Sequence, residues 1–336
     1  RLCSKGAALK DTLALPDRLT VPMMHGRPAG WDESLDFISA EFTRIRADHG
    51  PDAIGFYVSG QFLTEDYYVA NKLMKGFIGS GNIDTNSRLC MSSTVAGHMR
   101  AFGEDIVPGC YEDLEEADLV VLVGSNMAWC HPVLYQRLMA ARERRGTKIV
   151  AIDPRRTATA DTADLHLPIA PGTDVLLFNG LLVYLAETGA LDRRWIESHV
   201  AGCDAALAAA RRSAPSIETV AAAAELEAED LRRFYDLFAR TERAMTLYSQ
   251  GVNQSVSGAD KVNAILNCHL ATGRIGRAGM GPFSLTGQPN AMGGREVGAL
   301  ANQLAAHMGF TPDEVDRVGR FWKAPAIATR RGHKAV

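Results

Sequence analysis

An apolar run that ends in a small polar turn, followed by a helix and a second apolar run, constrains the fold of this 336-residue chain more than any other feature. The run at 118–123 (DLVVLV) predicts a buried strand, which the turn at 124–126 (GSN) ends. A helix is expected at 132–145, and then a strand at 148–152 that is closed by Asp153-Pro154. Strands that alternate with helices indicate an α/β fold whose parallel sheets are covered on both faces and bind ligands at the carboxyl ends of the strands.

The rest of the chain continues this alternation. Further elements are expected as helices at 31–49, 64–77, 91–101 and 260–271 and as strands at 53–59 and 244–249. Asp32 is a candidate cap for the helix at 31–49. Residues 175–240, rich in Ala, Leu and Glu, predict helices to which no chemistry is assigned. The glycine-rich stretch at 273–294 is too long for an ordinary connector, and no element is assigned to the polar tail from Phe310.

Composition and charge argue against several classes of function. A formal net charge of −3 disfavours nucleic-acid binding, and no run of about 18 apolar residues predicts a membrane span. Six scattered cysteines without a CxxC pair suit a reducing compartment. The nine histidines form no HxxxH or HxH pair, which argues against zinc, and no GxSxG elbow, P-loop or strand-linked GxGxxG motif occurs. With 46% hydrophobic residues, the chain can form about two domains.

Cys90 lies in the stretch GSGNIDTNSRLCMSST (79–94), behind a turn rich in Gly and Asn and ahead of a predicted helix. A thiol at such a junction meets the partial positive charge of the helix N-terminus, which favours the thiolate. A thiolate could act there as a nucleophile or as a ligand for a soft metal. An ordinary buried cysteine that serves as a small hydrophobe is the alternative interpretation of this position.

Two turns at strand ends suit a nucleotide. The turn Gly124-Ser125-Asn126 presents backbone N–H groups that can bind phosphate. The carboxylate of Asp153 can accept both the N1–H and the exocyclic amine of a guanine. Taken singly, these segments could equally be a plain sheet turn and a turn with solvated arginines. Their separation by one helix, as in a βαβ unit, favours the cofactor interpretation.

Six segments in a fixed order carry a resemblance to a known family. They are RLCSKG, GQFLTEDYYVANKLMKGFIGSGNIDTNSRLCMSSTVAG, GSNMAWCHPVLYQR, IDPRRTATADTADLHLPIAPGTD, GVNQS and CHLATGRIGRAGMGPFSLTGQPNAMGGREVG. Together they resemble the molybdopterin oxidoreductases, most closely their assimilatory nitrate reductase branch. The resemblance covers nearly the whole chain and implies the central part of a longer catalytic subunit.

The implied fold has two α/β/α lobes with mainly parallel sheets, as in the formate dehydrogenase and DMSO reductase group, and one lobe is discontinuous. Residues 1–20 would end an iron–sulfur domain. Residues 21–90 and 275–336 would form the discontinuous lobe with the molybdenum-ligand loop. Residues 91–274 would form an inserted Rossmann-like lobe that binds the pterin dinucleotide.

The resemblance also implies roles for individual residues. Cys90 would ligate molybdenum, Met91 would follow it as an apolar neighbour, and Arg295 would steer the substrate anion. Cys3 would be the last of four cysteines on a [4Fe–4S] cluster, whose other ligands lie outside this chain. Residues expected to contact the molybdenum cofactor, a bis-molybdopterin guanine dinucleotide, are Lys5, Gln61, Asn86, Gly124, Ser125, Asn126, Asp153, Arg155, Thr173, Asp174, Gln250 and Gln254.

The implied reaction is the reduction of nitrate to nitrite by oxygen-atom transfer in the cytoplasm. Electrons would come through the cluster from a donor such as a flavoprotein or a ferredoxin. Formate dehydrogenase is the near alternative, but that enzyme typically has histidine after the ligand residue, where this chain has Met91. A non-catalytic electron-relay subunit of the same fold is the distant alternative, and it would be expected to lose the cysteine that is retained here as Cys90.

Overall fold

The computed structural model describes residues 2–335, which form two compact units. One unit ends at Leu89 and resumes at Gln288, and the other runs from Cys90 to Gly287. One unit is therefore discontinuous in sequence, and the other is inserted into it. The predicted boundary after residue 90 had put the cysteine in the discontinuous lobe, whereas the contacts make Cys90 the first residue of the inserted unit.

The inserted unit is built on a five-stranded parallel sheet of order β7-β6-β5-β8-β9. Its strands are β5 (Leu119–Val123), β6 (Lys148–Ile152), β7 (Leu165–Leu167), β8 (Ala244–Tyr248) and β9 (Gly281–Ser284). Its helices are α5 (Ser92–Phe102), α6 (Asp113–Glu116), α7 (Met127–Cys130), α8 (Pro132–Arg145), η4 (Ala160–Thr162), α9 (Asp174–Glu187), α10 (Arg193–His199), α11 (Cys203–Ser213), α12 (Ile217–Ala224), α13 (Ala228–Arg240), α14 (Gln250–Asn253) and α15 (Gly258–Ala271).

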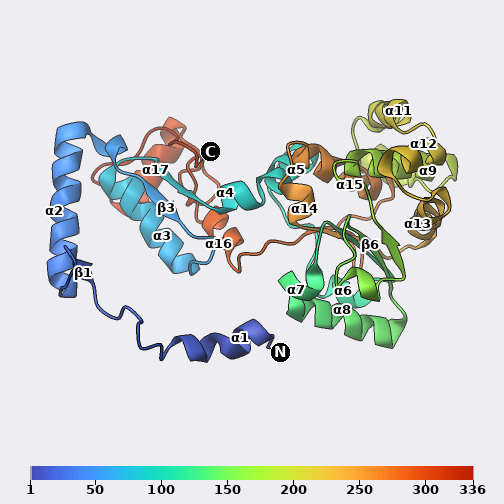
Figure 1. Ribbon diagram of the computed structural model, residues 1–336. Coiled ribbons are helices and arrows are strands. Elements are labelled where there is room, and N and C mark those ends of the chain that lie inside the picture. The colour runs from blue at the N-terminus through green and yellow to red at the C-terminus, as the bar shows by residue number, and fades with distance from the viewer. Residues whose placement is uncertain (1, 336) are drawn as a thin grey trace. The chain divides into compact units, whose positions relative to one another are not determined.

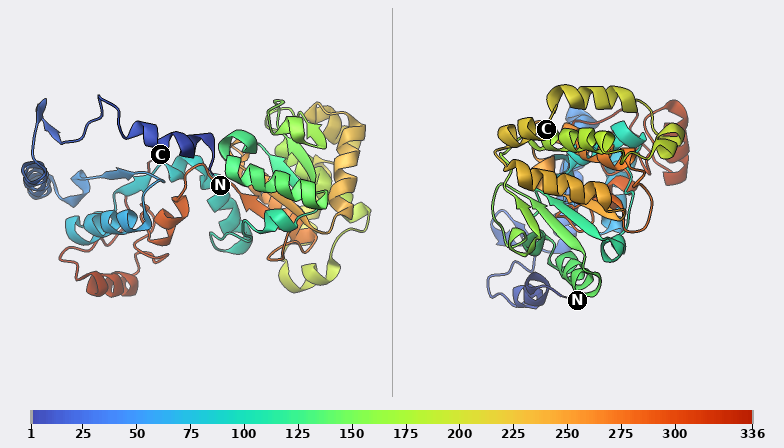
Figure 2. Two further views of the ribbon diagram at one scale, coloured as in Figure 1. Left: turned by 90° about the horizontal axis from the view of Figure 1, so that it is seen from below. Right: turned by 90° about the vertical axis from the view of Figure 1, so that its right-hand side faces the viewer.

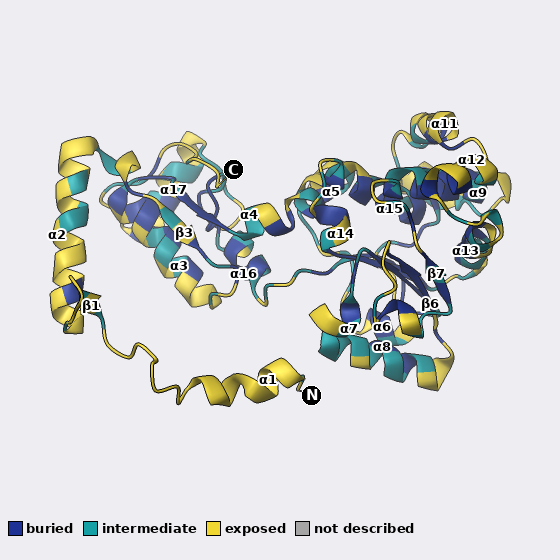
Figure 3. Ribbon diagram, viewed as in Figure 1, coloured by how far each residue is buried: buried dark blue, intermediate teal, exposed yellow. Residues whose placement is uncertain are grey.

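The sheet of this unit is covered on both faces, which confirms the predicted α/β class (Figure 1). Alternate residues of β5 point to opposite faces. Leu119, Val121 and Val123 pack in a cluster with residues of α9, α11, α12, α13 and α15. Val120 and Leu122 pack in a second cluster with residues of α6, α7 and α8. All five residues of β5 are buried, and Figure 3 colours the strands of this sheet mostly as buried; Figure 2 gives two further views of the strands and the helices that flank them.

The discontinuous unit combines both ends of the described chain. Its elements are α1 (Ser4–Ala8), η1 (Leu9–Thr12), β1 (Met23–Met24), β2 (Arg27–Pro28), α2 (Trp31–His49), η2 (Pro51–Ala53), β3 (Phe56–Val58), α3 (Thr64–Lys72), the π-helix η3 (Leu73–Ile78), β4 (Ile83–Thr85), α4 (Ser87–Cys90, whose last residue begins the other unit), α16 (Ala291–Glu296) and α17 (Pro312–Trp322). Strands β3 and β4 pair in parallel, and β1 and β2 pair antiparallel. Ala299 joins the core cluster that contains Tyr67 and Met74, so the C-terminal segment packs into the same unit as α3.

Most predicted elements are confirmed, with differences at particular residues. Helices α2 and α8 and strand β6 have the predicted bounds. The predicted Asp32 cap is wrong, because Gly30 is the N-cap and Asp32 lies in the first turn, where its charge suits the helix dipole. The helix expected through Phe77 is α-helical to Lys72 and then continues as the π-helix η3.

Strand β9 and helix α17 are among the elements that the sequence analysis missed. Strand β9 falls within the glycine-rich stretch, and its Pro282 is tolerated because β9 is an edge strand of the sheet. Helix α17 lies in the tail to which no element was assigned. A capping box formed by Thr311 and Glu314 starts this helix, with Pro312 in its first turn.

Candidate functional site

The loops after β5 and β8 meet where the strand order of the sheet reverses. Strands β6 and β7 lie on one side of β5, whereas β8 and β9 lie on the other. Such a switch point is where parallel α/β sheets bind ligands, at the carboxyl ends of the strands. The loops that meet there begin with Gly124 and with Ser249, so the switch point contains the predicted GSN turn and the GVNQS segment.

Two glycines let these loops touch. Gly124 has a φ of +53°, and a Cβ on it would lie 2.7 Å from the Cα of Gly251. The Gly251 N–H donates to the Gly124 carbonyl over 3.1 Å, and the Gly124 N–H donates to Ile152 O over 2.9 Å. A side chain at either glycine would push the loops apart. The first residue of the GSN turn is therefore required for the contact between the β5 and β8 loops.

Ser125 and Asn126 follow in the same turn. Ser125 is buried, and its Oγ has no hydrogen-bond partner among the described residues. An unpartnered buried hydroxyl at a strand end fits the edge of a polar ligand. Asn126 Oδ1 accepts from Thr159 Oγ1 over 2.9 Å, and Thr159 Oγ1 in turn accepts from the Ala128 N–H over 3.0 Å. Asn126 is therefore held by its own unit.

Cys90 and Gln250 are brought together in the inserted unit. Cys90 ends α4, is 7% exposed, and lies two residues before α5. Gln250 begins α14 directly after β8 and Ser249, and its Nε2 donates to Cys90 Sγ over 3.4 Å. Met91, the N-cap of α5, is also buried. The cysteine from the turn-rich stretch therefore meets the switch-point loop, whereas Gln254 is exposed.

Asp153 and Arg155 follow β6. One Asp153 carboxylate oxygen, Oδ1, accepts from the Arg155 N–H over 2.9 Å, which leaves Oδ2 as a second acceptor. Asp153 is 9% exposed, and the Arg155 side chain is exposed. The loop therefore holds a carboxylate in a fixed orientation at a strand end, as a site for a base edge requires.

Thr173 and Asp174 lie at the start of α9. Thr173 Oγ1 donates to Ala170 O over 2.7 Å, within its own turn. The Asp174 carboxylate lies 2.7 Å from Lys261 Nζ in an ion pair in which both side chains are buried. Lys261 Nζ is also 3.5 Å from Gly251 O, so this pair reaches the switch-point loop. Lys261 was not predicted, although a lysine beside the apolar run of α15 was a usable signal for a buried pair.

The remaining predicted residues lie in the discontinuous unit, which we describe by itself. Asn86 Oδ1 accepts from the Gly60 N–H over 2.8 Å, beside the exposed Gln61. The Asn290 N–H donates to Gly60 O over 3.2 Å, so the glycine-rich stretch that precedes Arg295 meets the Gln61 loop. In the same stretch, Arg295 Nη2 lies 2.6 Å from Met292 Sδ.

Cys3 and Lys5 lie near the start of the described chain. Cys3 is the N-cap of α1, and the backbone N–H of Gly6 lowers the pKa of its thiol. Lys5 is exposed. Within residues 2–335, no group of three or more His, Cys, Asp or Glu side chains is placed to hold a metal ion. Cys3 therefore belongs to no such group in the described part of this chain.

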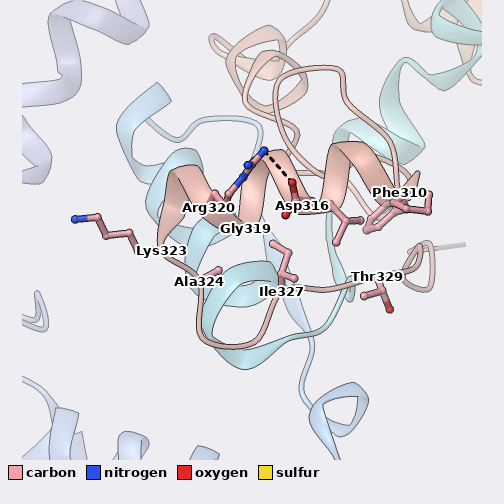
Figure 4. A pocket seen from close by; sticks show the side chains of 10 residues that line it. Phe310, Asp316, Gly319, Arg320, Lys323, Ala324, Ile327 and Thr329 are labelled. Carbon is pink, nitrogen blue, oxygen red and sulfur yellow. Dashed lines mark ion pairs between the residues drawn. The ribbon is translucent and has the colours of Figure 1, made fainter.

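The groove lined by α17 does not coincide with any predicted site. It has a volume of about 590 Å³ and is lined by residues such as Phe310, Val315 and Ile327 (Figure 4). Its one drawn ion pair joins Arg320 and Asp316 over 2.8 Å. None of the predicted site residues lines this groove, so the switch point remains the candidate site.

Comparisons with known proteins bear on the family of this chain. The family model described as "Molybdopterin oxidoreductase" matches residues 18–327. The chain is 52% identical over 336 residues to a nitrate reductase of Shewanella frigidimarina and 54% identical over 337 residues to one of Klebsiella oxytoca. All of this chain is matched in both cases, but only 36% and 38% of those proteins, so the chain spans less than two-fifths of their length.

A third relative and a solved structure complete the comparison. A periplasmic nitrate reductase of Desulfovibrio desulfuricans is 37% identical over 360 residues, which cover all of this chain and 47% of that protein. The structure of acetylene hydratase from Pelobacter acetylenicus matches with a TM-score of 0.67 over 80% of this chain and 37% of that one, at 22% identity. That likeness supports the fold alone. Because the family model covers almost the whole length, the chain belongs to the molybdopterin oxidoreductase family.

Proposed function

We propose that the whole protein containing this chain reduces nitrate to nitrite at a molybdenum centre carried by a bis-molybdopterin guanine dinucleotide. Its family membership and the names of its relatives support this proposal. The observation that carries it is the buried Cys90 thiol, which meets the Gln250 amide at the switch point of the sheet. A thiol at this position gives the site a ligand for the metal.

The residues at the switch point fit a pterin dinucleotide. Ser125 offers a buried hydroxyl without a partner, and the Gly124–Gly251 contact keeps side chains out of the turn. We assign Gly124, Ser125 and Asn126 to the pterin dinucleotide and Asp153 with Arg155 to its guanosine end. Further assigned contacts are Thr173, Asp174, Gln250 and Gln254 in the inserted unit and Lys5, Gln61 and Asn86 in the discontinuous unit.

The cofactor and the residues of the chain would have separate roles in this reaction. When bound, the cofactor would supply two electrons and take up the oxygen atom that nitrate loses. Cys90 would hold the metal, and the Arg295 guanidinium, permanently charged and planar, would bind the nitrate anion. Met91 is apolar and cannot accept a proton, which suits oxygen-atom transfer better than proton abstraction from formate. Overall, nitrate, two electrons and two protons give nitrite and water.

Electrons would reach the site through a [4Fe–4S] cluster of which Cys3 is one ligand, from a donor such as a flavoprotein or a ferredoxin. We propose an assimilatory role in the cytoplasm. All six cysteines of the chain are free thiols, Cys110 and Cys130 are exposed, and free thiols suit a reducing compartment. A relative is named periplasmic, so fractionation of cells that express the whole protein tests this location. No helix within the described residues is both long enough and apolar enough to cross a bilayer.

The test of the proposed function is Cys90→Ser in the whole protein, assayed with nitrate and with formate. Serine keeps the size of the side chain but replaces the sulfur ligand, so nitrate reduction should fall at least about a hundredfold, as when an essential catalytic group is removed. Cys110→Ser, which changes an exposed thiol of the same unit, is the matched control. Wild-type nitrate turnover and molybdenum content in Cys90→Ser would refute the assignment. Formate oxidation by the wild type in place of nitrate reduction would favour the alternative enzyme.

A further inference from the structure

Asn253 was not among the predicted site residues, yet its side chain makes hydrogen bonds at both ends. It is 4% exposed. Its Oδ1 accepts from the Thr94 N–H over 2.8 Å and from Thr94 Oγ1 over 2.7 Å. Its Nδ2 donates to Ser249 O over 2.9 Å. The amide therefore joins the first turn of α5 to the loop after β8.

These bonds close a ring that passes through Cys90. Thr94 lies four residues after Cys90, in the first turn of α5, and Ser249 immediately precedes Gln250. Gln250 Nε2 donates to Cys90 Sγ over 3.4 Å. Gln250 Oε1 lies against Ser249 Oγ and its Nε2 against Cys90 Sγ, the orientation of the amide in which its nitrogen donates to the sulfur. The Asn253 amide thus fixes the backbone of Ser249. From the next residue, the Gln250 amide reaches the Cys90 thiol.

Further contacts hold the ring in place. Ser93 Oγ donates to the backbone carbonyl of Asn253 over 2.7 Å. Thr94 Oγ1 lies 2.9 Å from Ser284 Oγ, which belongs to β9. Ser249 Oγ lies 2.9 Å from Leu285 O. The start of α5, the loop after β8 and the end of β9 therefore form one hydrogen-bonded assembly around Asn253.

We propose that Asn253 is a positioning residue that holds the Gln250 amide as a hydrogen-bond donor to the Cys90 sulfur and so raises the reduction potential of the metal bound there. This inference rests on the proposed function, because it requires a metal at Cys90. A donor to a ligand sulfur withdraws electron density and favours the reduced, more electron-rich state of the metal. Loss of either amide should therefore make the metal harder to reduce.

The test compares Gln250→Met and Asn253→Leu in the whole, cofactor-loaded protein. Both changes are neutral and similar in size to the original side chain, so neither alters the charge at the site. The midpoint potential of the molybdenum is measured by a redox titration followed by electron paramagnetic resonance. We expect the reduced-to-oxidised ratio at a fixed potential to fall about tenfold in each variant, or about 59 mV for a one-electron couple. The double variant should show no further shift, because Asn253 acts through Gln250.

Asn263→Leu is the matched control. Asn263 Nδ2 also donates to a carbonyl of α5, that of Gly97, over 2.8 Å, but from α15 and not from the loop after β8. We expect the midpoint potential of the molybdenum in Asn263→Leu to equal that in the wild type. A second measurement needs no metal: alkylation of Cys90 in cofactor-free protein, located by mass spectrometry. Asn253→Leu should raise that rate about tenfold by releasing the loop, whereas Asn263→Leu should not.

The outcomes separate the inference from the proposed function. Unchanged potentials in Gln250→Met and Asn253→Leu, in a protein that carries molybdenum and reduces nitrate, would overturn the inference and leave the function intact. A wild-type protein without molybdenum or nitrate reduction would overturn the function, and equal alkylation rates in Asn253→Leu and wild type would then overturn the positioning role as well. If Asn253→Leu does not fold, Gln250→Met alone decides, because it removes only the donor to sulfur.

Discussion

The two units hold the loops beside their predicted site residues in chemically different ways. In the inserted unit, the neutral amide of Asn253 holds the loop that carries Gln250. In the discontinuous unit, the ammonium of Lys75 holds the loop that follows Arg295. Lys75 is fully buried, and its Nζ donates to the carbonyls of Gly298 over 2.7 Å, Leu300 over 2.9 Å and Gln303 over 2.5 Å. The inserted unit thus holds its loop with a neutral amide dipole, whereas the discontinuous unit holds its loop with a positive charge.

The charge makes the second arrangement dependent on protonation. Burial lowers the pKa of Lys75 from 10.5 to about 7, and the nearby Asp84 carboxylate partly opposes this shift. An ammonium has three N–H donors, one for each carbonyl, whereas a neutral amine has only two. The amide of Asn253 does not titrate. The comparison teaches that a buried lysine can satisfy more carbonyls than an asparagine, but only at the cost of a response to pH.

The largest expected effect breaks the lysine arrangement. Lys75→Met leaves three buried carbonyls without a donor, and each unsatisfied group costs about 1–3 kcal/mol, partly offset because no charge is buried. We expect the free energy of unfolding of the whole protein to fall by about 3–5 kcal/mol at pH 7. Hydrogen exchange of residues 297–304 should rise at the same time. Lys72→Met, three residues earlier and half-buried, is the control, and equal losses in the two variants would refute a special role for Lys75.

The next effect sharpens the contrast between charge and dipole. Because the folded pKa of Lys75, about 7, lies below its ordinary value of 10.5, the folded protein releases this proton before the unfolded chain does. Stability due to this group should therefore rise between about pH 7 and 10.5, by about 1.4 kcal/mol per pH unit, because loss of the buried charge outweighs loss of the third N–H donor. The difference in unfolding free energy between wild type and Lys75→Met should grow by about 2–3 kcal/mol from pH 7 to 9. The difference between wild type and Asn253→Leu should stay flat over the same range, and a flat Lys75→Met difference would contradict the argument.

The fold was predictable where local patterns carry the information. The continuous apolar run of β5 identified a strand buried on both faces, and α8 was bounded by Pro132 and Gly146, both visible in the sequence. Strand β9 was missed because Gly281 and Pro282 argue against a strand, and only its place at the sheet edge makes them acceptable. Helix α17 was missed although the Thr311–Glu314 capping box is visible in the sequence and predicts a helix start.

The candidate site was predictable only in its outline. Cys90 and the GSN turn entered the candidate site through their residue types, their spacing and the family resemblance, and their roles stay predictions. Asn253 and Lys75 were not found, because their partners are mainly backbone groups of segments far away in the chain. Any residue type offers such carbonyls and N–H groups, so no motif records them. A lone lysine in the apolar segment LMKGFI was the single sequence signal for Lys75.

A smaller effect tests the inserted unit directly at its loop contact. Gly124→Ala places a Cβ 2.7 Å from the Cα of Gly251 and forces alanine into a φ of +53°. Strain of this kind costs about 2 kcal/mol. Denaturant unfolding should show that loss, and the hydrogen bond of 3.1 Å from the Gly251 N–H to the Gly124 carbonyl should open to exchange. Gly146→Ala, also at positive φ but with no atom within 4 Å of its added Cβ, separates backbone strain from loss of the loop contact.

The smallest effect concerns an exposed charge near the lysine-held loop. The Glu296 carboxylate lies 2.7 Å from His307 Nε2, and these side chains are 51% and 42% exposed. Solvent screens an ion pair at such exposure, so Glu296→Gln should change the free energy of unfolding by less than about 1 kcal/mol. This variant tests the comparison because the Glu296–His307 contact and the Lys75 contacts both hold the chain at or just after the end of α16. The Lys75 contacts are buried, whereas the Glu296–His307 contact is exposed. Denaturant unfolding of Glu296→Gln and Lys75→Met at pH 7 measures that distinction. A loss in Glu296→Gln as large as in Lys75→Met would show that position in the chain, and not burial of the ammonium among three carbonyls, decides how firmly the loop is held.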